Sequence, residues 1–176
     1  MIGSYAAAAG TVSSPTVTHP SLGLPPPDLT KGFPDAGARL RTNDLRLATR
    51  AVEVAANEDP TYADRIGEAG LRNLLQDATA FIDKLALCVA GDDPEWLRAF
   101  ADQTATVYRR RGIQLDDVIK LFEGIRASIR GILTAEELVP ADAALDEAIA
   151  VFKWHRRLAG DARKRNPILA ALYKGG

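Results

Sequence analysis

The chain has 176 residues, a length typical of one domain with a short tail. With 47% hydrophobic and 26% charged residues, a net charge of −1 and a sequence pI of about 6.1, it has the composition of an ordinary globular protein and no overall attraction to nucleic acid or anionic lipid. There is no apolar run long enough to span a membrane and no basic leader before an apolar segment, and the single cysteine, Cys88, rules out an intrachain disulfide. We therefore expect a cytoplasmic protein without a membrane span.

Residues 1–34 are rich in proline, serine, threonine and glycine, with Pro25, Pro26 and Pro27 at their centre. Such a segment buries too little apolar surface to offset the entropy of ordering it, so we expect an extended or disordered arm. The arm is a candidate partner-binding segment, and a plain flexible tail is the alternative.

Helical periodicity begins at Pro34, a residue favoured at helix starts, and ends between Asn57 and Pro60. This first stripe is formed by Leu40, Leu47, Ala48, Ala51, Val54 and Ala55. A second helix is predicted from Thr61 to Gly91, and Gly67 and Gly70 weaken its first turns enough to allow a break there. Its apolar stripe is formed by Ile66, Leu71, Leu74, Leu75, Ala78, Phe81, Ile82, Leu85, Cys88 and Val89.

A third helix is predicted to be capped by Asp93, with Pro94 at its first position, and to end at Gly112. Its inward side chains are Trp96, Leu97, Phe100, Val107 and Tyr108. The fourth helix starts at Leu115, and the acidic Asp116 and Asp117 suit the positive end of its dipole. It is predicted to bury Leu115, Val118, Ile119, Phe122, Ile125, Ile129 and Ile132.

Thr134 and Glu137 have the spacing of a capping box for one short turn, and a last helix is predicted after Pro140, ending near Gly160. This helix buries Leu145, Ala148, Ile149, Phe152 and, at the edge of the stripe, His155. No strand-like alternation occurs. We expect an all-α protein with an arm at 1–34, a compact domain of five to six helices at 35–160 and a basic tail at 161–176.

Catalytic and metal-binding motifs are absent from the sequence. The only histidines are His19 and His155, and no paired-cysteine, phosphate-loop or nucleophile motif is present. We therefore expect no enzymatic activity, no metal and no cofactor. Cys88 lies on an apolar stripe and is interpreted as a buried, inert thiol. His155 is the one candidate cofactor residue, as a haem ligand, with a hydrogen-bonded histidine at the edge of the core as the alternative.

A basic cluster near the C-terminus includes Arg163, Lys164 and Arg165. It is a candidate partner-binding surface, with a solvated tail as the alternative. The two helices joined by the turn at Gly112 resemble a helix-turn-helix motif. However, the predicted exposed face of the second helix carries Asp116, Asp117 and Glu123, which would repel the phosphates of nucleic acid. We do not expect nucleic acid binding.

The stretch 71–150 resembles the phycobiliproteins, the globin-like subunits of phycobilisomes. The resemblance rests on the spacing of residues matching the family pattern, namely Ala90, Gly91, Asp92, Tyr108, Gly112, Val118, Gly131, Leu133, Glu136, Asp146 and Ile149. In this register the pigment-bearing cysteine of the family falls on Asn73, and an adjacent Arg-Asp pair falls on Leu75 and Gln76. The resemblance therefore implies a globin-like fold without covalently attached bilin.

The segment from Arg109 to Phe122 also resembles the globin-like N-terminal sensory domains of RsbR-type stress regulators and the related domains of PucR-type regulators. The shared pattern is an Arg-rich helix end, a glycine, then Leu-Asp-Asp and an apolar helix. The two resemblances imply one fold and two functions. We expect a non-enzymatic protein–protein interaction subunit that is an accessory or assembly component of a larger complex, with a light-harvesting complex as one candidate. The alternatives are a homodimeric stress-sensing domain, and a haem or small-ligand sensor acting through His155.

Overall fold

The computed structural model describes residues 28–165, and the side chains of residues 28–159. Six helices account for nearly all of this part of the chain: α1 (Pro34–Thr42), α2 (Asp44–Glu58), α3 (Tyr62–Gly91), α4 (Glu95–Arg111), α5 (Leu115–Ile129) and α6 (Ala135–Arg165). No strand occurs among the described residues, so the predicted all-α class is confirmed. The proposed arm at Pro25, Pro26 and Pro27 lies outside the described residues.

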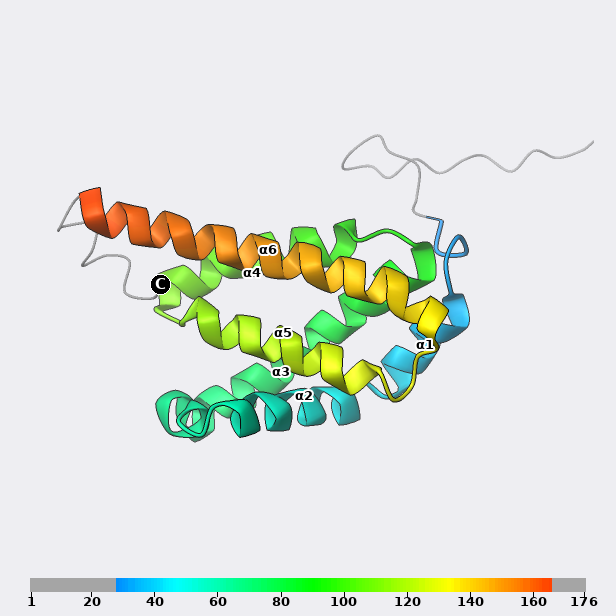
Figure 1. The fold of residues 1–176 in the computed structure, drawn as a ribbon, viewed down its shortest axis with the longest axis horizontal. Coiled ribbons are helices and arrows are strands. Elements are labelled where there is room, and N and C mark those ends of the chain that lie inside the picture. The colour runs from blue at the N-terminus through cyan, green and yellow to red at the C-terminus, as the bar shows by residue number, and fades with distance from the viewer. Residues whose placement is uncertain (1–27, 166–176) are drawn as a thin grey trace, which may run out of the picture.

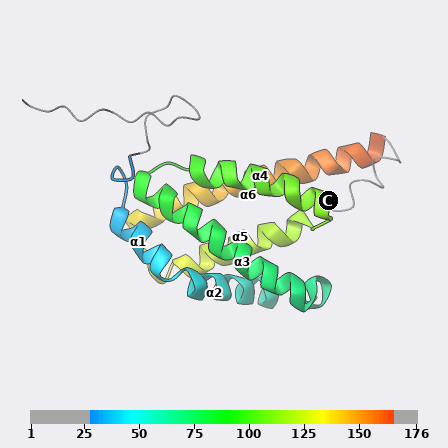
Figure 2. The same ribbon diagram turned by 180° about the vertical axis from the view of Figure 1, so that it is seen from behind.

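Helix α3 is the centre of the bundle, because it contacts each of the other five helices. Helices α1 and α2 pack on one side of it, α4 and α6 pack together on another, and α5 lies between α2 and α6 (Figures 1 and 2). The C-terminal end of α6 projects beyond the turn that joins α4 and α5 (Figure 1). None of the helices in 28–165 is long and apolar enough to cross a bilayer.

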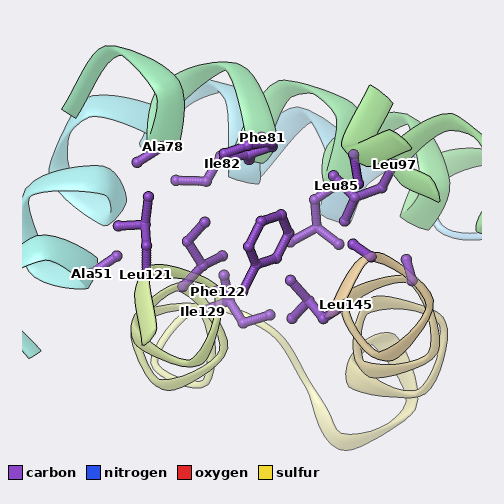
Figure 3. Close-up of a cluster of buried hydrophobic side chains, with 14 of the residues drawn as sticks. Ala51, Ala78, Phe81, Ile82, Leu85, Leu97, Leu121, Phe122, Ile129 and Leu145 are labelled. Atoms are coloured by element: carbon purple, nitrogen blue, oxygen red, sulfur yellow. The ribbon is translucent and has the colours of Figure 1, made fainter. Parts of the chain in front are cut away.

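Phenylalanine rings from four helices meet in the core. The Phe81 ring of α3 lies 4.6 Å from Phe122 of α5, 5.5 Å from Phe100 of α4 and 6.3 Å from Phe152 of α6, measured between ring centroids. Large aromatic side chains bury more apolar surface than any other residue, so this cluster fixes how the helices pack. Figure 3 shows Phe122 pointing from α5 towards Phe81 and Leu85.

The prediction of one continuous helix from Pro34 is wrong, because the structure divides this segment into α1 and α2 at Asn43. There the backbone leaves the helical region, and the Asn43 side-chain amide donates to the carbonyl of Arg39 at 2.8 Å. Leu40 and Leu47, on either side of the break, are both buried. The apolar stripe therefore continues across the break, which is why periodicity alone did not reveal it.

The predicted break before Pro140 is also wrong, since α6 runs through that residue. Proline lacks one backbone donor, but the buried Ala141, Ala144 and Leu145 that follow it hold the helix against the core. The capping box is confirmed: the Glu137 carboxylate accepts from the Thr134 N–H at 2.8 Å, and Thr134 Oγ1 accepts from the Glu137 N–H at 3.4 Å. The box opens the long helix rather than a separate turn, and α6 continues past the predicted end near Gly160.

The other predicted helix boundaries are close to those observed. The α3 backbone is interrupted at Gly67 (φ 71°), one of the two glycines at which the sequence allows a break, and α4 ends at Gly112 in the left-handed conformation. The Asp93 carboxylate accepts from the Glu95 N–H at 3.0 Å, at the start of α4. Val107 was predicted to face inward but is exposed, since Tyr108 next to it takes the buried position.

Candidate functional site

A pocket of about 310 Å³ opens between α3, the turn after α4 and the start of α5. We call it the α3–α5 pocket. Its volume lies at the lower end of the range for small-molecule sites, and it combines an apolar wall with convergent polar groups. Its lining is Arg65, Ile66, Gly70, Asn73, Leu74, Asp77, Tyr108, Gly112, Ile113, Gln114 and Asp117.

One side of the pocket is a network of charges around Arg65. The guanidinium donates to Asp117 Oδ1 at 2.6 Å and to Asp59 Oδ2 at 3.0 Å. Lys120 also pairs with Asp59, and Tyr62 donates its hydroxyl to the Asp117 carbonyl at 3.1 Å. The hydrogen bonds to Asp117 and then to Asp59 raise the pKa of Arg65 above its usual value. The hydrogen bond from Lys120, followed by those from Thr61 and Arg65, lowers the pKa of Asp59. The network ties the first turn of α3 to α5.

Asp117 was placed by the sequence on the exposed face of its helix, and that prediction is wrong. Only 5% of the residue is exposed. A buried carboxylate is costly unless it is paired, and here Arg65 supplies the counter-charge. The missed signal was positional, because Asp117 precedes the buried Leu121 and Gly124 by one and two helical turns.

We expect Arg65→Met to destabilise the fold more than Arg72→Met. The first change leaves the Asp117 carboxylate buried without its counter-charge, whereas the second removes an exposed Arg72–Glu68 pair within α3. Urea unfolding followed by circular dichroism measures both variants under the same conditions. Equal unfolding midpoints for the two variants would show that the Arg65–Asp117 contact contributes nothing beyond a surface ion pair.

Tyr108 and Asp77 also line the pocket. The Tyr108 hydroxyl donates to Asp77 Oδ2 at 2.5 Å, and only 3% of the tyrosine is exposed. Burial raises the pKa of Tyr108 above its ordinary value, and the hydrogen bond to Asp77 raises it further. The phenol therefore remains a donor at neutral pH and fixes the orientation of the Asp77 carboxylate. No lysine or arginine among residues 28–159 forms an ion pair with Asp77.

Asn73, which the phycobiliprotein resemblance places at the pigment cysteine, lines the rim of this pocket and is exposed. Cys88 is 1% exposed and lies further along α3, in the core. The structure therefore brings Asn73 together with Asp77 and Tyr108, and does not bring Cys88 to them.

His155 joins α4 to α6. Its Nε2 lies 2.8 Å from Asp102 Oδ1 and its Nδ1 lies 3.3 Å from a guanidinium nitrogen of Arg109, and the residue is 5% exposed. Both ring nitrogens thus have polar partners in this structure, as in the hydrogen-bonded interpretation of this residue. His155 does not line the α3–α5 pocket. No group of three or more potential metal-ligating side chains occurs in the described part of the chain.

Cys88 is buried, and its thiol takes part in a hydrogen bond. Its Sγ accepts a hydrogen bond from the Leu97 N–H at 3.3 Å, which satisfies one of the free donors in the first turn of α4. Burial raises the pKa of the thiol to about 11. Since the thiolate is the reactive form, the thiol should be inert in the folded protein.

We expect Cys88 in the native protein to react with a disulfide reagent at pH 8 at least about a hundredfold more slowly than in urea-unfolded protein, because burial and a raised pKa both suppress the thiolate. The colour released by Ellman's reagent measures both rates. Complete reaction of the folded protein within the mixing time would contradict the buried position of Cys88.

The outward face of α6 carries an apolar stripe. Val139 is 69% exposed, Trp154 49% and Leu158 38%, and the small Ala143 and Ala150 are exposed on the same face. Successive members of this set are four or seven positions apart, which is one or two helical turns, so they share one side of the helix. α6 thus has apolar residues on its outer side as well as its buried side.

The candidate partner-binding residues Arg163, Lys164 and Arg165 form the last turn of α6, which extends the helix into the expected basic tail. Their side chains lie outside those described. Pro25, Pro26 and Pro27 lie outside the described residues altogether.

No family model matches the chain, and no curated protein matches it by sequence. The resemblances to phycobiliproteins and to RsbR-type sensory domains therefore remain hypotheses.

Proposed function

We propose that the chain is a non-enzymatic, globin-like protein–protein interaction domain, and that it acts as a homodimer joined through the outer face of α6. The observation that supports this most directly is the exposed stripe of Val139, Ala143, Ala150, Trp154 and Leu158. Exposed apolar side chains lined up on one helix face are typical of a surface that another helix covers.

A second copy of the same helix is the occupant that charge favours. Glu147 and Lys153 flank Ala150 on this face at equal distances along the sequence, and both are exposed. In a two-fold antiparallel pair centred on Ala150, Glu147 of each copy would face Lys153 of the other. The small Ala150 at the axis would allow the two helices to approach closely.

Charge exchange tests this arrangement. Glu147→Lys alone and Lys153→Glu alone should each weaken dimerisation by about tenfold, because each places like charges at two symmetric contacts. The double variant should restore it, since the opposite charges face each other again. Analytical ultracentrifugation measures the dissociation constants, and Leu45→Ala, at a 59% exposed site on α2, is the control that should change nothing.

Failure of the double variant to recover would exclude the antiparallel pair. A chain that sediments as an 18.9 kDa monomer at every accessible concentration would overturn self-association altogether.

The two resemblances assign this interaction domain to different settings. In an accessory subunit of a light-harvesting type of complex, affinity capture from the native host should recover components of that complex. In a stress-sensing regulator it should recover a signalling partner instead. Recovery of neither, together with a monomeric chain, would contradict the proposed function.

A further inference from the structure

The α3–α5 pocket contains a carboxylate that is oriented but not neutralised. The Asp77 carboxylate accepts from the Tyr108 hydroxyl, and it has no cationic partner among residues 28–159. Tyr108 is itself fixed by burial and by packing against Phe152, with ring centroids 6.4 Å apart. Asp77 is therefore held at the pocket wall with one oxygen left over for another donor.

The charges around the pocket disfavour an anion. Asp77 and Asp117 both line it, while the charge of Arg65 is already balanced by Asp117 and Asp59. Arg111 also acts electrostatically on Tyr108, but it is exposed, so solvent and salt screen its charge. A positive charge placed beside Asp77 would gain a charge-assisted hydrogen bond that a neutral group could not match.

The rest of the pocket is shaped for a compact apolar body. The aliphatic wall is formed by Ile66 and Leu74 of α3 and by Ile113 of the turn between α4 and α5. Asn73 and Gln114 add amide groups at the rim. Small-molecule sites commonly show this combination of apolar lining with a few fixed polar groups.

We propose that the α3–α5 pocket binds a small organic cation, with its protonated nitrogen on the Asp77 carboxylate and its apolar body against Ile66, Leu74 and Ile113. No residue of the α6 surface lines this pocket, so the proposed dimer and the proposed ligand site can each be tested without the other. The ligand would contact α3 on both sides of the interruption at Gly67, because Ile66 precedes that residue and Asp77 follows it. Occupancy would therefore stabilise the two parts of α3 in their present relation.

Three probes with one carbon skeleton and different charge test the proposal: tryptamine, which is cationic, the neutral alcohol tryptophol, and the anion indole-3-acetate. Two-dimensional ¹⁵N–¹H NMR of the full chain reports binding through the side-chain amides of Asn73 and Gln114. Tryptamine should shift these signals in a saturable way, tryptophol should bind at least about tenfold more weakly, and indole-3-acetate should bind weakest.

Two variants locate the cation. Asp77→Asn should weaken tryptamine binding by about tenfold or more, whereas Asp83→Asn, the same charge change elsewhere on α3, should have no effect. Asn73→Arg places a tethered cation one helical turn from Asp77 at an exposed position, and should compete with tryptamine while leaving the fold intact. It also keeps the test usable if Asp77→Asn is poorly folded.

Equal affinity for all three probes, or tryptamine binding unaffected by both Asp77→Asn and Asn73→Arg, would overturn the proposal. So would the absence of any saturable shift at Asn73 and Gln114 with tryptamine.

Discussion

Replacing Phe81 with alanine is expected to lower the free energy of unfolding by about 3–5 kcal/mol, the usual cost of removing a buried phenylalanine ring. Phe81 is 1% exposed and its ring meets those of Phe100, Phe122 and Phe152. The change removes the one ring of α3 that touches an aromatic residue of each of α4, α5 and α6. Because proteins of this size are stable by only about 5–15 kcal/mol, much of the total stability should be lost.

Urea unfolding of Phe81→Ala, followed by circular dichroism, measures this effect. Leu45→Ala is the matched control, since that leucine is 59% exposed on α2 and its truncation should change stability by less than about 0.5 kcal/mol. A loss of less than about 1 kcal/mol for Phe81→Ala would contradict a core organised around this ring.

Replacing Gly124 with alanine is expected to cost about 1–3 kcal/mol, although alanine is the better helix former. A Cβ added at Gly124 would lie 2.2 Å from the carbonyl oxygen of Ala51, which belongs to the α2 backbone. A backbone atom cannot rotate away, so α2 and α5 would have to separate. The larger Gly124→Val should be worse still.

The melting temperature by calorimetry measures the effect of Gly124→Ala. Gly131→Ala is the control, because a Cβ at that position would meet no atom within 4 Å and its φ is not in the left-handed region. An unchanged melting temperature for Gly124→Ala would show that α2 and α5 do not cross as closely as the structure indicates.

The fold class and most of the core were predictable because helical periodicity reports burial directly. Phe81, Phe122 and Phe152 all lie on predicted stripes and all are buried. The predictions failed where packing overrode a local signal. Asn43 breaks a stripe that continues on both sides, and Pro140 lies inside α6 because neighbouring buried alanines and Leu145 hold that turn in place.

The candidate site was much less predictable than the fold. Arg65 and Asp117 are separated by 52 residues in sequence, and Tyr108 and Asp77 by 31, so no local pattern joins them. Asp117 was interpreted as a dipole-stabilising residue at a helix start, which is correct for its position in α5 but does not reveal its partner. Only the packing of α3 against α4 and α5 brings these pairs to one pocket.

The interruption of α3 at Gly67 has a further consequence for the dynamics of the protein. The turn from Tyr62 to Ile66 is held by its side chains to α5, through Tyr62 and Arg65, more than by continuation of the α3 backbone. Such a segment can open as its own cooperative unit while the Phe81 core stays closed. Its amide hydrogens should then exchange with solvent ahead of those around Phe81, at a rate governed by the Arg65–Asp117 contact.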